Sequence, residues 1–573
     1  MVLQFKTPFM QFCSDFIDCK RQSSAGTDDE WKCKVAAINL ALEIGRVEKC
    51  VDFMNFLAKQ VLPELQERNM AMRPLVKAAS IKFVFFLHDR FRDLLGFILY
   101  LLVAHLGSKD VVVHTYAAQA IEKILSCNVS SGDPGTTPNN PVIGNMELKI
   151  VFYDLIYGLL RIVGNPGWDE NQYVMKCIMM TCSMAGDDPQ RFANAIWKKL
   201  CMALDRASKK SRKNPQYNHY LFESIAILIR SVCTKNVAHA TSCENIFGPR
   251  LKEVLENDYE GQFIPYVYQL LALILEFSPE GGRMSDTCTA AFPQLLKLNR
   301  WEFSRNIPSL TRLLIAYLRK GIIQTLNHQS KSLDDIVVVF HVLIQNENYK
   351  QYTFDLLRAI VLYVPPEVRC FKEVLNVVKF EAMSSHPTRL SNEILSHFFT
   401  LFVAKFGTKA FYDVFDCKSN DLAINFLLYK WIPSLLSTPP TRLEAKSHIF
   451  GLTRLLFGDR ALGFDIQSEI ICCAIKIILS PNFYRDALSS DGDDDYVEIR
   501  YDATYPVLHF AAMPSSDPSP DVSDATTKLA QMLRELSDER HHLFTFLMEK
   551  CHLETTSFSK LQSLLVEAGV WNP

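Results

Sequence analysis

The feature that most constrains the fold is the helical period of the apolar residues, which recurs along most of the chain. In residues 306–320 (NIPSLTRLLIAYLRK), apolar residues fall at positions i, i+3, i+4, i+7 and i+8 counted from Leu310, and so mark one face of a helix. Residues 264–276 repeat this pattern, residues 220–233 come close to it, and no convincing run alternates strictly between apolar and polar residues. The sequence therefore predicts an all-α protein.

The composition supports this prediction. Glycine (22 residues) and proline (26 residues) make up about 8% of the 573 residues, below the roughly 12% that is usual. A many-stranded β protein needs a turn every 8–12 residues or so, which so few turn-forming residues do not supply. Hydrophobic residues (48%) and charged residues (22%) are close to globular averages, which excludes disorder over the whole chain.

The helices recur in pairs. Their entrances lie about 40–45 residues apart, the spacing of HEAT and armadillo repeats. Because one such pair cannot bury its apolar face alone, neighbouring pairs stack. We therefore predict an all-α, HEAT/armadillo-type α-solenoid superhelix of antiparallel helix pairs, with several unrelated helical domains as the alternative. The predicted entrances lie near Trp31, Met72, Val111, Asn218, Phe263, Asn306, Tyr349 and Arg389, with one or two further units around residues 145–207.

Proline positions refine the helix boundaries. Asn306 precedes Pro308 and is predicted to cap a helix, because a proline in the first turn loses no backbone hydrogen bond. Pro189 and Pro265 mark similar entrances. Pro433 marks either an entrance or a kink within a helix.

Three segments interrupt the helical pattern. Residues 127–144 form a loop rich in Gly, Pro and Asn, and residues 209–214 (KKSRKN) form a short basic loop. We predict HEAT-like helical repeats over residues 1–488, an acidic and Pro/Ser-rich loop or insertion over residues 489–524, and C-terminal helical repeats over residues 525–573.

The overall charge is close to balanced. With 61 Lys+Arg and 63 Asp+Glu, the formal net charge is −2, which excludes a globally basic nucleic-acid binder. The basic and the acidic loop are each either a solvated loop or a contact for an oppositely charged protein partner. The basic loop could also be a nuclear localisation signal or contact nucleic acid, although no aromatic residues are interleaved with its charges. The candidate partner-binding residues are Lys209, Lys210, Arg212, Lys213, Asp491, Asp493, Asp494 and Asp495.

The sequence has no motif for catalysis, cofactor binding or metal binding. It lacks a phosphate-binding loop, a dinucleotide-binding fingerprint, a zinc-protease helix and a nucleophile elbow. The 16 cysteines are expected to be free thiols, many of them buried. The longest apolar runs, residues 94–106 and 266–275, are shorter than the roughly 20 residues that span a bilayer. We therefore expect no enzyme activity, cofactor, metal ion, nucleic-acid partner or membrane insertion.

Several long strings resemble one family of transport proteins, the exportins that return importin-alpha to the cytoplasm, within the karyopherin-beta superfamily of HEAT solenoids. The match runs from about residue 28 to the acidic loop. The strings that carry it best are residues 111–118 (VVVHTYAA), 218–230 (NHYLFESIAILIR), 257–276 (NDYEGQFIPYVYQLLALILE) and 301–321 (WEFSRNIPSLTRLLIAYLRKG).

The resemblance implies a nuclear export receptor. Such a receptor binds importin-alpha together with Ran in its GTP form, meets nuclear pore proteins transiently, and shuttles between nucleus and cytoplasm. Each ligand would tighten the other by the same factor, because cooperativity is reciprocal. Members of the family are nearly twice as long, so we expect this chain to be a C-terminal portion without the importin-beta N-terminal domain and main Ran-binding surface. The alternative is a truncated, non-transporting HEAT scaffold for protein–protein interaction.

Overall fold

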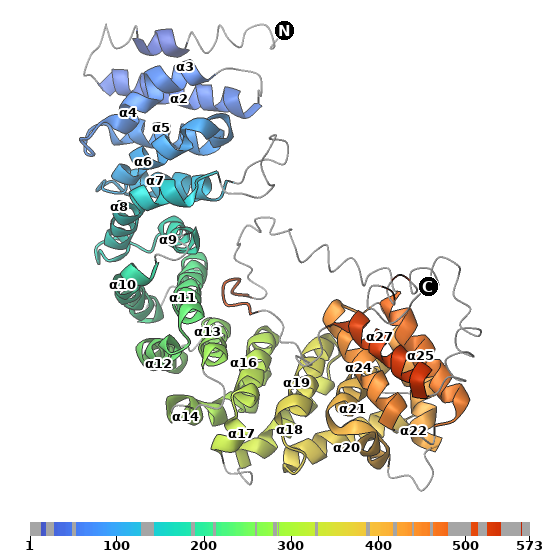
Figure 1. Ribbon diagram of the computed structural model, residues 1–573. Coiled ribbons are helices and arrows are strands. Elements are labelled where there is room, and N and C mark those ends of the chain that lie inside the picture. The colour runs from blue at the N-terminus through green and yellow to red at the C-terminus, as the bar shows by residue number, and fades with distance from the viewer. Residues whose placement is uncertain are drawn as a thin grey trace. The chain divides into compact units, whose positions relative to one another are not determined.

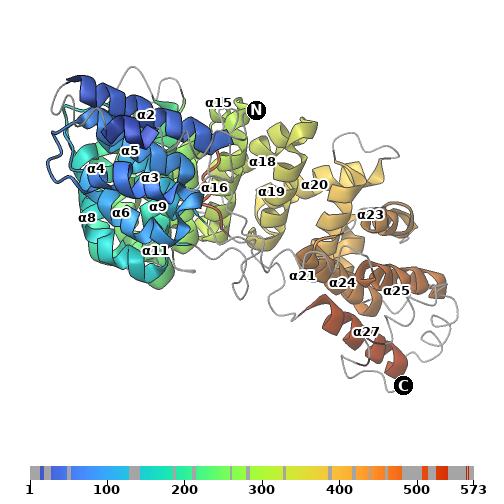
Figure 2. The same cartoon turned by 90° about the horizontal axis from the view of Figure 1, so that it is seen from above.

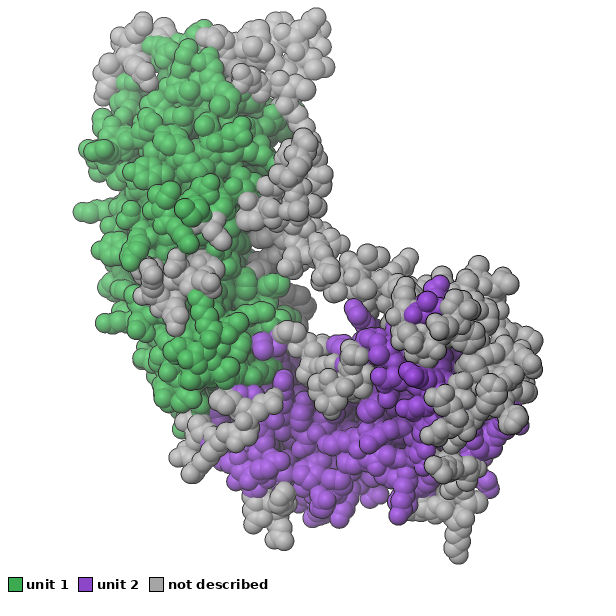
Figure 3. Space-filling view, viewed as in Figure 1, with its two compact units in different colours: residues 1–277, 494–512 green, residues 278–493, 513–573 purple. Residues whose placement is uncertain are grey.

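The computed structural model consists of two compact units, which are coloured separately in Figure 3. Unit 1 contains residues 1–277 and 494–512, and unit 2 contains residues 278–493 and 513–573, so the chain crosses between them three times. The structure describes residues 13–18, 28–47, 53–127, 142–184, 189–209, 214–257, 261–278, 284, 286–326, 331–384, 390–415, 421–437, 440–458, 462–479, 506–513, 524–539, 563 and 566.

Unit 1 is a stack of helix pairs in two layers, and Figure 2 looks down this stack. Successive helices of the first layer contact each other, and from α5 onward each also contacts the partner that precedes it in the chain. The first layer consists of α2 (Asp28–Val47), α5 (Pro74–Leu87), α7 (Val111–Leu125), α9 (Gln172–Met184), α11 (Pro215–Lys235) and α13 (Ile264–Phe277). The second consists of α3 (Met54–Phe56), α4 (Leu62–Gln66), α6 (Leu95–His105), α8 (Asn145–Val163), α10 (Pro189–Lys209) and α12 (His239–Asn257).

Unit 2 repeats this two-layer arrangement (Figure 1). Its first layer consists of α16 (Ile307–Arg319), α19 (Lys350–Tyr363), α21 (Asn392–Val414), α24 (Arg442–Gly458) and α27 (Ala525–Glu539). Its second layer consists of α14 (Asp286–Leu295), α15 (Leu298–Trp301), α18 (Lys331–Ile344), α20 (Arg369–Met383), α22 (Asp421–Phe426), α23 (Ile432–Ser437) and α25 (Phe464–Ile478), and the short α17 (Ile322–Thr325) follows α16. Single 3₁₀ turns lie at His88–Arg90, Arg92–Leu94, Ser304–Asn306 and Glu347–Tyr349.

The two-layer stack of helix pairs in each unit confirms the predicted all-α solenoid class. The predicted helix entrances correspond to the first-layer helices: α7 begins at the predicted Val111, and α16 and α19 begin within one residue of Asn306 and Tyr349. No helix in the described part of the chain is both long enough and apolar enough to cross a membrane. The domain limits at residues 488 and 524 remain predictions, because residues 480–505 and 514–523 lie outside the described residues.

The two possible roles of Pro433 are resolved in favour of a break within a helix. The helix that begins as α22 passes through a π turn, Leu427–Trp431, and continues as α23 with Pro433 at its second position. A wider π turn accommodates the missing proline N–H and the bulk of the ring. The same arrangement occurs in unit 1, where the π turn Leu57–Val61 precedes Pro63 of α4.

The prediction that Asn306 caps α16 is wrong. The Asn306 side chain makes no capping hydrogen bond and is buried; its Nδ2 donates instead to the carbonyl of Arg300 at 3.2 Å. The residue ends a 3₁₀ turn and already has helical backbone angles, whereas a capping side chain needs an extended backbone. At the start of α11, by contrast, Asn214 has an extended backbone and accepts a hydrogen bond from the N–H of Tyr217 at 3.2 Å.

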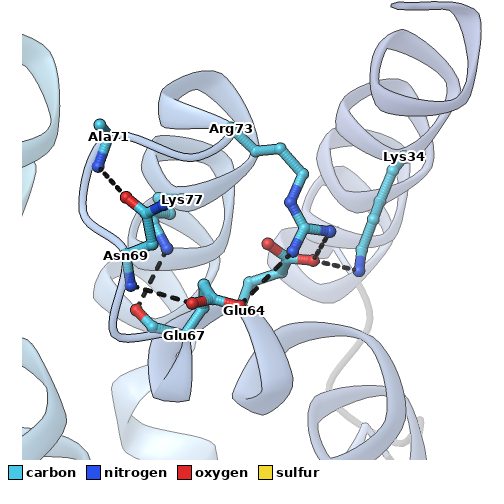
Figure 4. A network of polar contacts seen from close by, with 7 residues as sticks. All are labelled: Lys34, Glu64, Glu67, Asn69, Ala71, Arg73 and Lys77. Atoms are coloured by element: carbon cyan, nitrogen blue, oxygen red, sulfur yellow. Dashed lines mark hydrogen bonds and ion pairs between the residues drawn. The ribbon is translucent and has the colours of Figure 1, made fainter. Parts of the chain in front are cut away.

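A buried ion network joins the first helix pairs of unit 1 (Figure 4). Lys34 and Arg73 reach the same carboxylate oxygen of Glu64, with N–O distances of 2.8 and 3.0 Å. Lys34 and Glu64 are almost fully buried, and the Arg73 guanidinium lies 4.4 Å from the centre of the Trp31 ring. Arg73 also has the positive φ of 52° that directs the chain into α5. The network therefore couples α2, α4 and the start of α5.

We predict that Glu64→Gln destabilises unit 1 by about 3–5 kcal/mol, because the substitution removes the buried carboxylate that both Lys34 and Arg73 contact. The free energy should be measured from urea unfolding followed by circular dichroism. The matched control is Glu43→Gln, which removes an exposed ion pair with Arg46 and should cost less than about 1 kcal/mol. Equal effects of the two substitutions would show that the buried network contributes no more than a surface pair.

Unit 2 contains a buried histidine without hydrogen bonds. Neither ring nitrogen of His448 on α24 has a partner, and the side chain is 2% exposed. Its ring centre lies 4.5 Å from that of His397, which faces Glu444 at 3.9 Å. Burial, and secondarily the charge that His397 can carry, hold the pKa of His448 well below its usual value. The folded chain therefore keeps this imidazole neutral.

We predict that His448→Leu makes unit 2 less sensitive to acid. The unfolded chain takes up a proton at His448 below its ordinary pKa of about 6.5, and the folded chain does not. The native protein therefore loses stability as pH falls below that value, by up to about 1.4 kcal/mol per pH unit for this one group. The difference between native and variant unfolding free energies, measured from pH 7 to pH 5, should shrink or invert toward acid. A constant difference over that range would contradict the assignment.

Candidate functional site

The predicted basic segment is only partly within the described residues. Lys209 is the last residue of α10 rather than part of a loop, and its ammonium lies 3.7 Å from the carboxylate of Glu253 in an exposed ion pair. Lys210, Arg212 and Lys213 lie outside the described residues, as do Asp491, Asp493, Asp494 and Asp495 of the predicted acidic segment. Their role in partner binding stays a prediction.

One cation beside the basic segment has a structural role. The Arg206 guanidinium donates hydrogen bonds to the carbonyls of Val163 and Asn165, the latter at 3.4 Å. These carbonyls belong to the end of α8 and the turn that follows it, where helix carbonyls have no intrahelical partner. Arg206 therefore holds the turn between α8 and α9.

On the first layer of unit 1, polar side chains of two helices form a set of hydrogen bonds with a segment that is distant in the sequence. Residues 506–512, here called the docked segment, lie against α11 and α13 and appear as the short red trace beside them in Figure 1. The side-chain amide of Gln269 on α13 donates to the carbonyl of Pro506 at 2.8 Å and accepts from the N–H of Leu508 at 2.8 Å. The amide thus donates one hydrogen bond to the backbone of the segment and accepts one from it, as a neighbouring β-strand would.

Glu223 on α11 continues this pairing. Its two carboxylate oxygens accept the successive N–H groups of His509 and Phe510 at 2.6 and 3.0 Å. Arg230, two turns further along α11, donates to the carbonyl of Ala512 at 3.1 Å. Three side chains thus hold five main-chain groups of the docked segment.

The electrostatics of this site are set by burial. Glu223 has no exposed surface, and burial raises the pKa of its carboxyl to about 7, although the two N–H donors oppose the shift. Burial lowers the pKa of the neighbouring His219 to about 4. His219 is therefore neutral at pH 7, and its ring nitrogen, 3.9 Å from the Glu223 carboxylate, supplies no positive charge. The docked segment's N–H groups are the direct donors to this carboxylate.

The sequence analysis did not identify these residues, but a signal was present. Glu223 stands in the apolar run YLFESIAILI, and Gln269 stands in YVYQLLALIL. A single polar residue on an otherwise apolar helix face must find a partner when it is buried. This rule predicts that a partner exists but does not say where in the chain it lies.

Two neighbouring cavities, with volumes of about 160 and 340 Å³, lie at the turn between α8 and α9. Trp168 and Glu170 line both, and Arg206 lines the smaller one. His114 lines the larger one, but burial lowers the pKa of this imidazole, whose Nδ1 lies 3.2 Å from the carbonyl of Ser108. Neither of these two linings pairs a cysteine or serine nucleophile with a base, so they give no support to catalysis.

One described trio brings possible metal ligands together. Single ligand atoms of His88, Asp89 and Cys127 lie within 4.8 Å of one another. Asp89 also pairs with Arg92 at 3.7 Å, and burial raises the pKa of the Cys127 thiol to about 11. Metal binding needs the thiolate and an available carboxylate. The trio is therefore a poor ligand set at neutral pH.

The second layer of unit 1 carries an exposed apolar stripe on α8. Its members, spaced at i, i+4, i+7 and i+11 along one helix face, are each at least 65% exposed. Exposed apolar surface of this kind marks a contact for another molecule more often than isolated apolar residues do. The stripe consists of Met146, Ile150, Tyr153 and Tyr157.

Comparison with known proteins identifies relatives over almost the whole chain. An exportin-2 from Pagrus major is 28% identical over 552 residues, which are 93% of this chain and 56% of the relative. The exportin-2 of Homo sapiens is 26% identical over 553 residues, with the same coverage of each chain. The chain thus spans about half the length of the curated relatives it matches.

Solved structures show the same fold. The exportin Cse1 in its cargo-free, cytoplasmic state superposes with a TM-score of 0.73 at 21% identity, covering 97% of this chain and 57% of that one. Lph2, a bidirectional nuclear transport receptor in S. cerevisiae, superposes with a TM-score of 0.60 at 13% identity, covering 98% and 60%. At these identities the likeness concerns the fold alone.

Family models make the assignment. A model described as Cse1 matches residues 23–121. The model described as CAS/CSE protein, C-terminus, matches residues 135–563, about three quarters of the chain. The chain belongs to the CAS/CSE family.

Proposed function

We propose that this chain acts in nuclear export as a receptor that binds importin-alpha cooperatively with GTP-bound Ran and returns it to the cytoplasm. The observation that carries the proposal is the match of residues 135–563 to the C-terminal part of the CAS/CSE family. The relatives that cover 93% of the chain are named exportin-2. Because the chain spans about half of their length, their role is proposed for it rather than assigned.

The proposed mechanism is binding linkage without catalysis. A stack of helix pairs offers a long surface on each layer, and adjacent pairs adjust by small rotations. If importin-alpha and Ran favour the same arrangement of pairs, each raises the affinity of the other by one common factor. The chain then needs no cofactor, catalyses no reaction, and shuttles through the nuclear pore between nucleus and cytoplasm.

Three surfaces are proposed as contacts. The basic segment with Lys209 and Arg212 would face an acidic partner surface, and the acidic segment around Asp493 would face a basic one. The α8 stripe would be covered transiently by apolar groups of nuclear pore proteins. The exposure of Met146 and Tyr157, 73% and 71%, supports this part of the proposal.

We predict that the purified chain binds importin-alpha, and that GTP-loaded Ran tightens this binding by about 5- to 150-fold, the usual range of allosteric coupling. Isothermal calorimetry with and without GTP-loaded Ran measures the effect, and GDP-loaded Ran is the control. Binding of importin-alpha without any effect of Ran would contradict the cooperative part of the proposal. Binding of neither partner by a chain whose circular dichroism shows folded helices would favour the scaffold alternative.

We predict that Arg212→Glu weakens the complex with importin-alpha roughly two- to fivefold at low salt, the effect of losing one exposed charge pair. Raising the ionic strength should reduce the difference, because salt screens exposed charges. The matched control is Lys252→Glu on α12, an equally drastic reversal of an exposed charge that pairs with Glu256. If both variants weaken binding equally, the basic segment has no special role.

A further inference from the structure

The site on α11 and α13 contacts the main chain of the docked segment. All five hydrogen bonds from Glu223, Gln269 and Arg230 to this segment end on backbone N–H or C=O groups. Gln269 is held in place by a further hydrogen bond from its amide to the carbonyl of Pro265 at 3.0 Å. Backbone groups are common to all sequences, so these contacts do not depend on the side chains of the segment.

The site buries only some of the segment's side chains, and so it selects among sequences at few positions. Leu508 and Ala511 are buried, at 1% and 0% exposure, whereas Val507 between the two Gln269 contacts is 51% exposed. The Val507 N–H makes no hydrogen bond in the described structure. The site thus requires an apolar residue at one position, a small residue three positions later, and an accessible backbone around them.

We propose that the face of α11 and α13 around Glu223 and Gln269 is a recognition site for extended peptide segments, and that the docked segment is its exchangeable built-in occupant. The external ligand is an unfolded or extended segment of a protein partner that carries the same apolar and small residues. A helical segment cannot replace it, because the N–H groups of a helix interior are already used within the helix.

Exchange of the occupant is physically more favourable than leaving the site empty. Without the segment, Glu223 loses both N–H donors and Gln269 loses its two partners in the segment, and unsatisfied buried polar groups are costly. The built-in occupant has the advantage of covalent attachment, which gives it a high effective concentration. An external segment therefore competes well only when the docked segment is weakened. The inference concerns this face alone and does not depend on the identity of the cargo proposed above.

The test uses the full chain, a labelled peptide of residues 504–513 (TYPVLHFAAM), and a neighbouring pair of substitutions. Leu508→Asp places a carboxylate at a buried anchor position, 1% exposed, and should release the docked segment. Val507→Asp adds the same charge one residue earlier, where the side chain is exposed. Fluorescence anisotropy should show the peptide binding to the Leu508→Asp chain at least tenfold more tightly than to the Val507→Asp or native chain.

Two modified peptides test whether the backbone is what the site recognises. N-methylation at His509 removes the N–H that Glu223 accepts and should weaken binding to the Leu508→Asp chain at least tenfold. N-methylation at Val507 removes an N–H that the site does not use and should change binding less than threefold. Adding Glu223→Ala to the Leu508→Asp chain should abolish binding of the unmodified peptide.

The proposal is overturned if the Leu508→Asp chain, folded by circular dichroism, does not bind the peptide, or if both N-methyl peptides bind alike. If that variant fails to fold, hydrogen exchange on the native chain decides. Amides of Leu508, His509 and Phe510 that exchange at least tenfold faster than those in the middle of α11 support an exchangeable occupant. Amides that exchange as slowly as those of α11 show that the segment is a permanent part of the core, and the proposal then fails.

Discussion

Burial of apolar faces between successive helix pairs is the interaction on which the rest of this structure depends. In α16, Leu310 and Leu314 have no exposed surface, although α16 alone could not cover them. The next helix in the same layer, α19, and the partner in the other layer, α14, supply contacts that α16 alone lacks. Stability is therefore a property of neighbouring pairs, as expected of a solenoid, and polar groups inside the stack must be satisfied locally.

The buried polar groups show how such local satisfaction fixes the register of the stack. Glu64 is paired by cations from the helices on either side of it, and Lys320 donates to the carbonyl of Ser278 at the start of unit 2. The Arg206 guanidinium and the Lys430 ammonium likewise donate hydrogen bonds to main-chain carbonyls of the preceding repeat. A long cation that reaches the carbonyl end of a neighbouring helix neutralises groups that have no intrahelical partner. Repeats linked in this way cannot slide past one another without breaking a buried bond.

The sequence was sufficient to predict the helices and their repeat, because both depend on the local spacing of apolar residues. Apolar periodicity placed α7 and α16 almost to the residue, because a helix face is visible within fifteen residues. The cap at Asn306 was predicted wrongly, because its buried side chain bonds to Arg300 and competes with the capping role. The site at Glu223 could not be located, because its partner is the backbone of residues 286 and 287 positions away, and backbone groups leave no trace in a sequence.

The separation between Glu223 and the docked segment has a consequence for the newly made chain. The ribosome adds about 5–20 residues per second, so His509 is synthesised roughly 15–60 s after Glu223, given the 286 residues between them. Helices α11 and α13 contact each other and their neighbours, and can fold during this interval because a solenoid assembles from adjacent repeats. Each nascent molecule therefore passes through a period in which this face is formed and its own occupant does not yet exist. A peptide bound there at that time is either another part of the same chain or a segment of another molecule.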